Sequence, residues 1–98
     1  MQFLVIAGAA EPIDFSKLED RPERANRYRD ELVARGTIVH HAHIAGHRAH
    51  MWIFEVDGVD ELDRVMAEDP MAPFMSGSPQ IIPLVSPDRM REREEATR

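Results

Sequence analysis

The order of its apolar segments constrains the fold of this chain more than any other feature. The first segment, MQFLVIAG, has the length and composition of a buried strand that ends at Gly8. By the same reasoning the chain continues as helix, strand, strand, helix and strand, over residues 20–36, 37–45, 49–57, 58–69 and 80–85. The sequence therefore predicts the element order β-α-β-β-α-β.

This order is typical of the ferredoxin-like α+β fold, an antiparallel four-stranded sheet with two helices on one face. Pro83 within the last strand favours an edge position or a bulge, because proline cannot donate a ladder hydrogen bond. The strands at 1–8 and 49–57 carry apolar residues on both sides, so the face without helices also needs a cover. A second copy of the chain would provide it, which predicts a dimeric α+β barrel as a homodimer or a higher homo-oligomer.

The length of 98 residues fits one domain, expected over residues 1–87 and followed by a charged tail over residues 88–98. The formal net charge of −6 argues against a nucleic-acid partner, which needs a clustered basic surface. The absence of cysteine excludes disulfides and thiolate chemistry. The apolar start lacks the basic flank of a signal peptide, and no apolar run could span a bilayer. We therefore expect a cytoplasmic protein without a membrane partner.

Five histidines crowd the segment HHAHIAGHRAH, and they are the residues most suggestive of chemistry. Strand alternation sends neighbouring residues to opposite faces, so His40 is expected on one face and His41 and His43 on the other. The sequence does not fix the register of the next strand, so His50 could lie near His40 or near His43. We expect His40 and His50 to face an apolar pocket beside Trp52, and the turn residue His47 to be solvated.

Several short motifs together resemble the muconolactone isomerase family. They are ELVARG at 31–36, His40, Gly46, FEVDGVDEL at 54–62, PMAPFM at 70–75 and IPL at 82–84. The resemblance implies a small isomerase that needs no cofactor and is built as a dimeric α+β barrel that assembles further. Similar chains also occur as cyclase-like proteins of secondary metabolism, so a resemblance at this level leaves the substrate open.

A double-bond shift within a lactone such as muconolactone needs a base that titrates near neutral pH, a contact for the developing enolate and a clamp for the carboxylate. Histidine suits the first task and arginine the last. The candidate catalytic residues are His40, His50, His43 and Glu55, with His41 as a further possible base. The candidate substrate-binding residues are Arg48, as the carboxylate clamp, and Trp52, Phe74 and Met75, as walls for a flat apolar ligand.

A metal site is the main alternative for the histidines, since His41-x-His43 is a real ligand spacing that His50 or Glu55 could complete. No established metal motif is matched, and we predict neither a metal nor a cofactor.

The sequence therefore predicts a cofactor-independent isomerase or cyclase that acts on a small lactone or unsaturated oxo-acid by His-mediated proton transfer. The alternatives are a polyketide cyclase or cofactor-free monooxygenase on the same barrel, or a non-catalytic protein that binds a small molecule.

Overall fold

The computed structural model describes residues 1–9, 13–75 and 79–97 of the chain. The four strands are β1 (Gln2–Gly8), β2 (Ile38–His43), β3 (Ala49–Glu55) and β4 (Gln80–Leu84), and the three longer helices are α1 (Arg21–Ala34), α2 (Val59–Ala67) and α3 (Pro87–Ala96). Two single turns of 3-10 helix, η1 (Phe15–Lys17) and η2 (Ala72–Phe74), lie in the connections. The predicted order β-α-β-β-α-β is thus confirmed, and α3 follows it.

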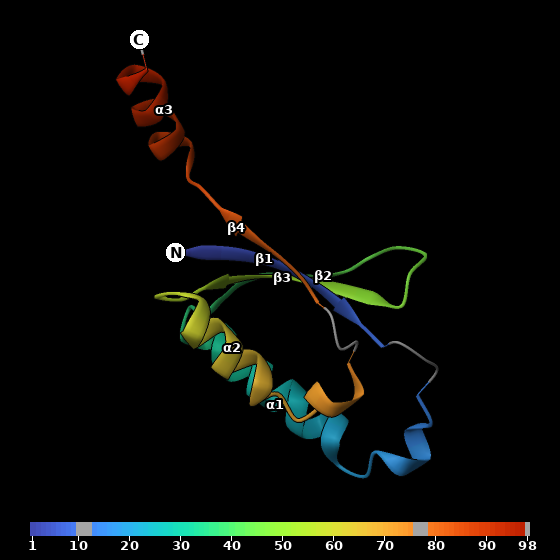
Figure 1. Cartoon of the computed structure of the whole chain (residues 1–98). Helices are drawn as coiled ribbons and strands as arrows, with labels where there is room; N and C mark the ends of the chain where they lie inside the picture. The colour runs from blue at the N-terminus through green and yellow to red at the C-terminus, as the bar shows by residue number, and fades with distance from the viewer. Residues whose placement is uncertain (10–12, 76–78, 98) are drawn as a thin grey trace.

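The strands form one antiparallel sheet in the order β2-β3-β1-β4. Helices α1 and α2 lie side by side against one face of this sheet, and within the described residues no helix covers the other face (Figure 1). This is the predicted ferredoxin-like α+β arrangement. The edge position expected for the strand that contains Pro83 is also confirmed, because β4 pairs only with β1.

The core lies between the sheet and the two helices. Phe3 and Val5 of β1 are fully buried and alternate with half-buried residues that point to the open face. Trp52 and Phe54 of β3 and Leu62 of α2 complete the centre of the core. Burial of this apolar surface, at roughly 25 cal/mol per Å², is the main force that holds the helices on the sheet.

Two glycines allow local geometry that other residues would resist. Gly36 has φ +78° just after α1, and the next amide, Thr37 N–H, donates to the Leu32 carbonyl at 2.9 Å, which closes the helix end. At Gly8 a Cβ atom would lie 2.0 Å from the Arg48 carbonyl oxygen, so the end of β1 can approach the start of β3 only with glycine there.

Most of the charged tail is helical, because α3 begins at Pro87 and Ser86 caps it by accepting a hydrogen bond from the Arg89 amide. All residues of α3 are exposed, and the helix projects away from the sheet beyond β4 (Figure 1). The expected domain boundary near residue 87 stays a prediction.

Candidate active site

A bulge in β2 decides which way the histidines point. Ile38 pairs with Phe54 and His40 pairs with Ile53, so one extra residue is inserted between these pairs. Beyond the bulge, His41 lies opposite Trp52 and His43 opposite His50. Directly paired residues share a face, so Ile38, His41 and His43 all lie on the face that the helices cover.

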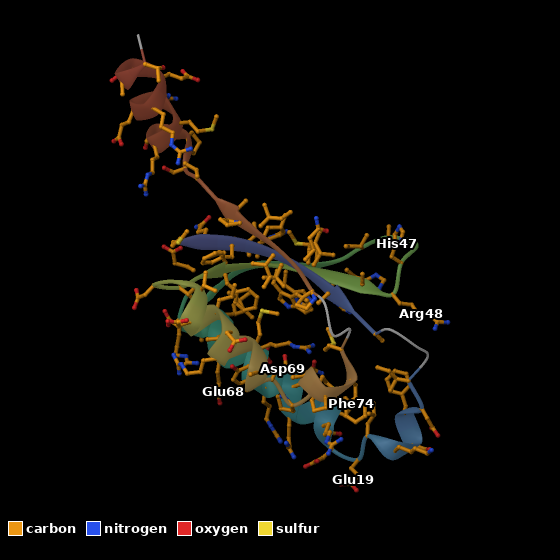
Figure 2. The ribbon with its side chains drawn as sticks, in the orientation of Figure 1. Glu19, His47, Arg48, Glu68, Asp69 and Phe74 are labelled. Atoms are coloured by element: carbon orange, nitrogen blue, oxygen red, sulfur yellow. The ribbon has the colours of Figure 1, made fainter. Side chains whose placement is uncertain are left out.

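The expectation that His40 lies in a pocket beside Trp52 was therefore wrong, whereas His50 does lie beside Trp52. His40 pairs with Ile53 and is exposed on the open face, because the inserted residue shifts the alternation of β2 by one position. The register places His50 beside His43 and, diagonally, beside His41. His47 and Arg48 are exposed at the tip of the β2–β3 hairpin, so the solvated position expected for His47 is confirmed (Figure 2).

Three of the five histidines form one cluster, which we call the imidazole cluster: His41, His43 and His50. Nε2 of His41 lies 3.1 Å from Nδ1 of His50, a hydrogen bond between the two rings. The His41 ring stacks on Trp52 with 5.3 Å between centroids and 9° between planes, and the His50 ring stacks on Trp52 at 5.6 Å and 21°. His43 meets His50 edge to face at 4.9 Å. The indole of Trp52 therefore orients both rings of the hydrogen-bonded pair.

The surroundings of this pair favour neutral imidazole. Burial lowers the pKa of His41 below its usual 6.5, and the charges of Arg29 and His40 lower it further. Burial also lowers the pKa of His50, with smaller contributions from His41, His43 and Arg29. Neutral imidazole can accept a proton, so both residues are in the form that a general base requires.

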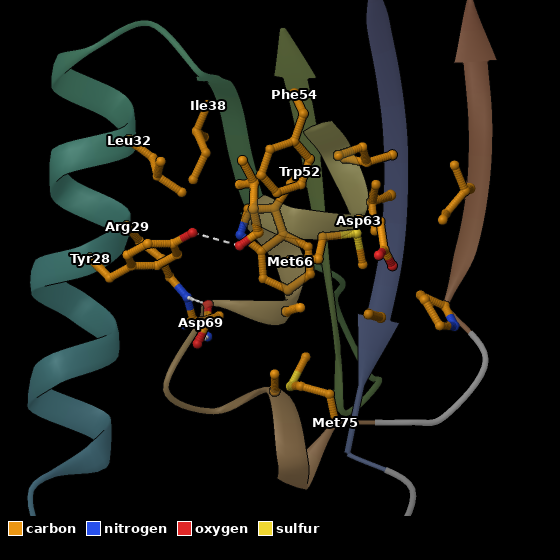
Figure 3. A pocket seen from close by; sticks show the side chains of 18 of the residues that line it. Tyr28, Arg29, Leu32, Ile38, Trp52, Phe54, Asp63, Met66, Asp69 and Met75 are labelled. Atoms are coloured by element: carbon orange, nitrogen blue, oxygen red, sulfur yellow. Dashed lines mark hydrogen bonds and ion pairs between the residues drawn. The ribbon is translucent and has the colours of Figure 1, made fainter. Parts of the chain in front are cut away.

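A cavity of about 290 Å³ lies between the sheet and the two helices (Figure 3). Most of its wall is apolar and comes from β1, β3, α1 and α2, and its polar groups belong to Tyr28, Arg29, Asp63 and Asp69. Trp52 lines the cavity and also stacks on His41 and His50. The cavity and the imidazole cluster therefore meet at one indole ring, although none of the three histidines lines the cavity and His41 and His43 are exposed. We treat the two together as one candidate site.

Two contacts join α1 to the end of α2 across this cavity. Nε of Arg29 donates to Oδ2 of Asp69 at 2.8 Å, and Nη2 donates to Oδ1 at 3.3 Å. The Tyr28 hydroxyl donates to the Val65 carbonyl oxygen at 2.6 Å. Burial, with help from Glu68 and Asp69, raises the pKa of Tyr28, so this hydroxyl keeps its proton. These contacts hold charged and polar groups at fixed positions on an otherwise apolar wall.

The other expected site residues lie partly inside and partly outside the cavity wall. Met75 lines the cavity together with Trp52, as expected, whereas Phe74 and Arg48 are not among its lining residues. Phe74 instead packs under Arg21, whose Cζ lies 5.0 Å from the ring centroid. Glu55 is exposed at the end of β3, 3.4 Å from the N-terminal amino group, so it lies outside the cavity wall.

Sequence reasoning missed Tyr28, Arg29 and Asp69 as site residues. A signal for Arg29 was present, because it lies four residues after the buried Ala25 and three before the buried Leu32. That spacing places Arg29 on the stripe of α1 that faces the core, where an unpaired charge would be costly. Its partner Asp69 is 40 residues away, and no local pattern links the two.

Within residues 1–9, 13–75 and 79–97, no group of three or more His, Cys, Asp or Glu side chains is arranged to hold a metal ion. Over the same residues, no helix has both the length and the apolar character needed to cross a membrane.

Comparison with known proteins shows which family the chain belongs to. Residues 1–89 match the family described as muconolactone delta-isomerase. The crystal structure of a muconolactone isomerase is similar with a TM-score of 0.75 and 26% identity, over 88% of this chain and 90% of that one. No match was found among curated protein sequences.

A second solved structure shares the fold. It is 5-chloro-2-hydroxyhydroquinone dehydrochlorinase from Burkholderia phenoliruptrix in complex with 2,5-dihydroxybenzoquinone, with a TM-score of 0.62 and 16% identity. The alignment covers 91% of this chain and 98% of the dehydrochlorinase. At this identity the likeness concerns the fold alone.

Proposed function

The chain belongs to the muconolactone delta-isomerase family, and from that premise we propose that it is a cofactor-independent isomerase that shifts a double bond within a small lactone or unsaturated oxo-acid. One observation carries the proposal: His41 and His50 form a hydrogen-bonded pair with lowered pKa values against the indole that lines the cavity. A double-bond shift needs one group to remove a proton from carbon and one group to return a proton elsewhere.

The hydrogen bond between the two neutral rings provides both groups at once. Each neutral imidazole has one N–H donor and one acceptor nitrogen. If Nε2 of His41 donates to Nδ1 of His50, then Nδ1 of His41 is left as an acceptor and Nε2 of His50 carries a proton. The opposite tautomers exchange these roles. The pair therefore always presents one base and one acid.

The proton balance of the reaction follows from this pairing. The acceptor nitrogen takes the proton from substrate carbon, and the electron pair of the broken C–H bond moves into the π system as an enolate. The proton shared by the two rings shifts across the 3.1 Å hydrogen bond, and the outer N–H of the partner ring protonates the far carbon. Substrate and product have the same atoms, and the pair is left in its opposite tautomers, ready for the reverse assignment.

The cavity fits a small, flat, apolar substrate. Its volume of about 290 Å³ is at the lower end of the range for small-molecule sites, about 300–1,000 Å³. Trp52 offers an aromatic wall, and Met66 and Met75 are adaptable apolar neighbours. Tyr28, Arg29, Asp63 and Asp69 provide the polar contacts that would orient the substrate.

We also propose that the chain works as a homo-oligomer. The open face of the sheet presents apolar side chains without a helix over them: Leu4, Ile6, Ala42, Met51, Ile53 and Ile82. Ile82 is 37% exposed. A second copy of this face is the simplest cover, because two equivalent surfaces bury each other around a two-fold axis.

Turnover in heavy water tests the chemical proposal. Purified protein incubated with muconolactone in D₂O should convert it to its double-bond isomer, the enol-lactone, followed by proton NMR. A relay that exchanges with solvent should introduce deuterium at the carbon that is protonated. His50→Gln should slow both events by roughly 10²–10⁴-fold, the usual contribution of a general acid or base. His47→Gln at the exposed turn is the matched control.

Two results would count against the proposal. If His50→Gln turned over within a factor of about three of wild type, far below that range, the histidine relay would be wrong. If wild type bound muconolactone without converting it, muconolactone would not be the substrate, and the cyclase and binding-protein alternatives would be favoured.

A further inference from the structure

We propose that Arg29 is the group that binds the substrate oxygen on which negative charge develops when the histidine pair removes a proton. This inference rests on the proposed isomerase function. It adds a residue of helix α1 to the two histidines, which lie in the sheet. It assigns to Arg29 a contact with the carbonyl oxygen of the substrate.

Arg29 is placed at the junction of the cavity and the imidazole cluster. It lines the cavity, its side chain is 20% exposed, and its Cζ lies 5.8 Å from the centroid of the Trp52 ring (Figure 3). The same indole stacks on His41 and His50. The guanidinium group and the two imidazole rings therefore all lie against one indole ring.

Asp69 fixes the direction in which Arg29 donates. A guanidinium has five N–H donors. Asp69 accepts from Nε and from Nη2, and its Oδ1 also accepts from the Met71 amide at 2.8 Å. Among the described residues Nη1 has no hydrogen-bond partner. The edge of the guanidinium formed by Nη1 and Nη2 is therefore held in place with donors to spare.

The ion pair with Asp69 leaves part of the Arg29 guanidinium available for an oxygen that carries negative charge. Asp69 pairs with Arg29, and Asp63 adds a second carboxylate to the cavity wall. Asp69 does not use all the N–H donors of the Arg29 guanidinium. The remaining N–H donors can still strengthen their hydrogen bonds as the carbonyl becomes an enolate oxygen, and only such differential interactions speed the reaction.

Phenols test this without knowledge of the true substrate, because a phenolate is a flat, stable analogue of an enolate. The probes are 4-nitrophenol, at a pH where it is ionised, and 4-nitroanisole, its neutral match. Calorimetry gives the affinities, and quenching of Trp52, the only tryptophan in the chain, reports binding beside it. Wild type should bind the phenolate about 10-fold or more tightly than the anisole, the factor expected for a charge-assisted hydrogen bond.

Arg29→Met should remove this preference by weakening phenolate binding about 10-fold, while anisole binding stays within about 3-fold of wild type. Arg29→Lys keeps the positive charge but lacks the fork, so it should lose part of the preference and remains informative if Arg29→Met does not fold. Arg24→Met is the matched control, because Arg24 is an exposed residue of the same helix.

Three outcomes would overturn the assignment: equal affinity of wild type for the two probes, no binding of either probe, or an equal loss of both probes in Arg29→Met and Arg29→Lys. None of these depends on turnover. A failure of the isomerase proposal, seen as absent turnover with the phenolate preference intact, would therefore be distinguishable.

Discussion

The two faces of the sheet are built from alternate residues of the same strands, yet only one of them is complete in the single chain. On the helix-covered face, Phe3, Val5, Trp52 and Phe54 are at most 5% exposed. On the open face, the neighbouring Leu4, Ile6, Met51 and Ile53 are only partly buried. Both faces are apolar, so apolar patterning alone does not distinguish the face that carries the site from the face that needs a partner.

The histidines on the two faces also differ in their surroundings. On the covered face, His41 and His50 are joined by a hydrogen bond and stacked on Trp52, beside a cavity that also contains an ion pair. On the open face, His40 lies opposite Ile53, among apolar side chains. The same residue type therefore has two environments, and the difference comes from one inserted residue in β2. We expect chemistry on the first face and assembly on the second.

Assembly should give the largest effect. Ile53→Lys places a charge in the middle of the open face, and burial of an unpaired charge costs several kcal/mol at each of the two equivalent positions in a dimer. We expect the variant to be monomeric, with a mass near 11.2 kDa by light scattering, while wild type is at least dimeric.

Val33→Lys is the matched control, because Val33 is an exposed apolar residue of α1, and it should assemble like wild type. A wild-type mass near 11.2 kDa at micromolar concentration would show that the open face needs no second copy.

Replacing one histidine on each face in turn should give the next largest effect. His41→Gln removes one ring of the relay and should lower turnover by roughly 10²–10⁴-fold. His40→Gln changes the opposite face and should leave the chemical step within a factor of about three, well under that range. Steady-state rates on the same substrate check both, with assembly confirmed by light scattering. A large loss in His40→Gln with intact assembly would reverse the assignment of the faces.

The free energy of unfolding should respond differently to substitutions at Phe3 and Leu4, which are neighbours in β1 but face opposite sides of the sheet. Phe3→Ala should lower the free energy of unfolding by about 3–5 kcal/mol at every protein concentration, because Phe3 is fully buried within one chain. Leu4→Ala should cost less, and under the proposed assembly its cost should grow with protein concentration, because a second copy would cover that side chain. Urea denaturation at several concentrations measures both. Equal costs that do not depend on concentration would contradict the two-copy interpretation.

The pH dependence should be the smallest effect, and it belongs to the covered face. The pKa values of His41 and His50 are lower in the folded chain than the usual 6.5, so the unfolded chain binds protons first as the pH falls. Stability is therefore full above that value, falls as the pH drops through it, and stops falling below the folded pKa values. Urea midpoints between pH 7.5 and pH 5 should decrease, and less so in the double variant His41→Gln, His50→Gln. Equally steep curves would exclude the pair as the source.

The sequence predicted most of the fold from local patterns. Apolar runs, Gly8 and Gly36 mark the ends of elements, and their order specifies the ferredoxin-like topology. Pro83 predicted an edge strand because its missing N–H is a property of the residue itself. Trp52 and Met75 were expected in the pocket because soft, apolar side chains suit the walls of a site for a flat ligand, and both line the cavity.

Only the tertiary structure decided which residues make the site. Alternation predicts a face by counting residues, and one bulge between Ile38 and His40 reverses every later position of β2, so that His41 and not His40 meets His50. Ile38 pairs with Phe54 on the core side, just before that bulge. This pairing depends on β3, so the sequence of β2 alone does not reveal it. The Arg29–Asp69 ion pair likewise joins residues 40 positions apart. Local propensity fixes which elements form, whereas long-range packing fixes the register and the partners, because both depend on surfaces that exist only once the chain has folded.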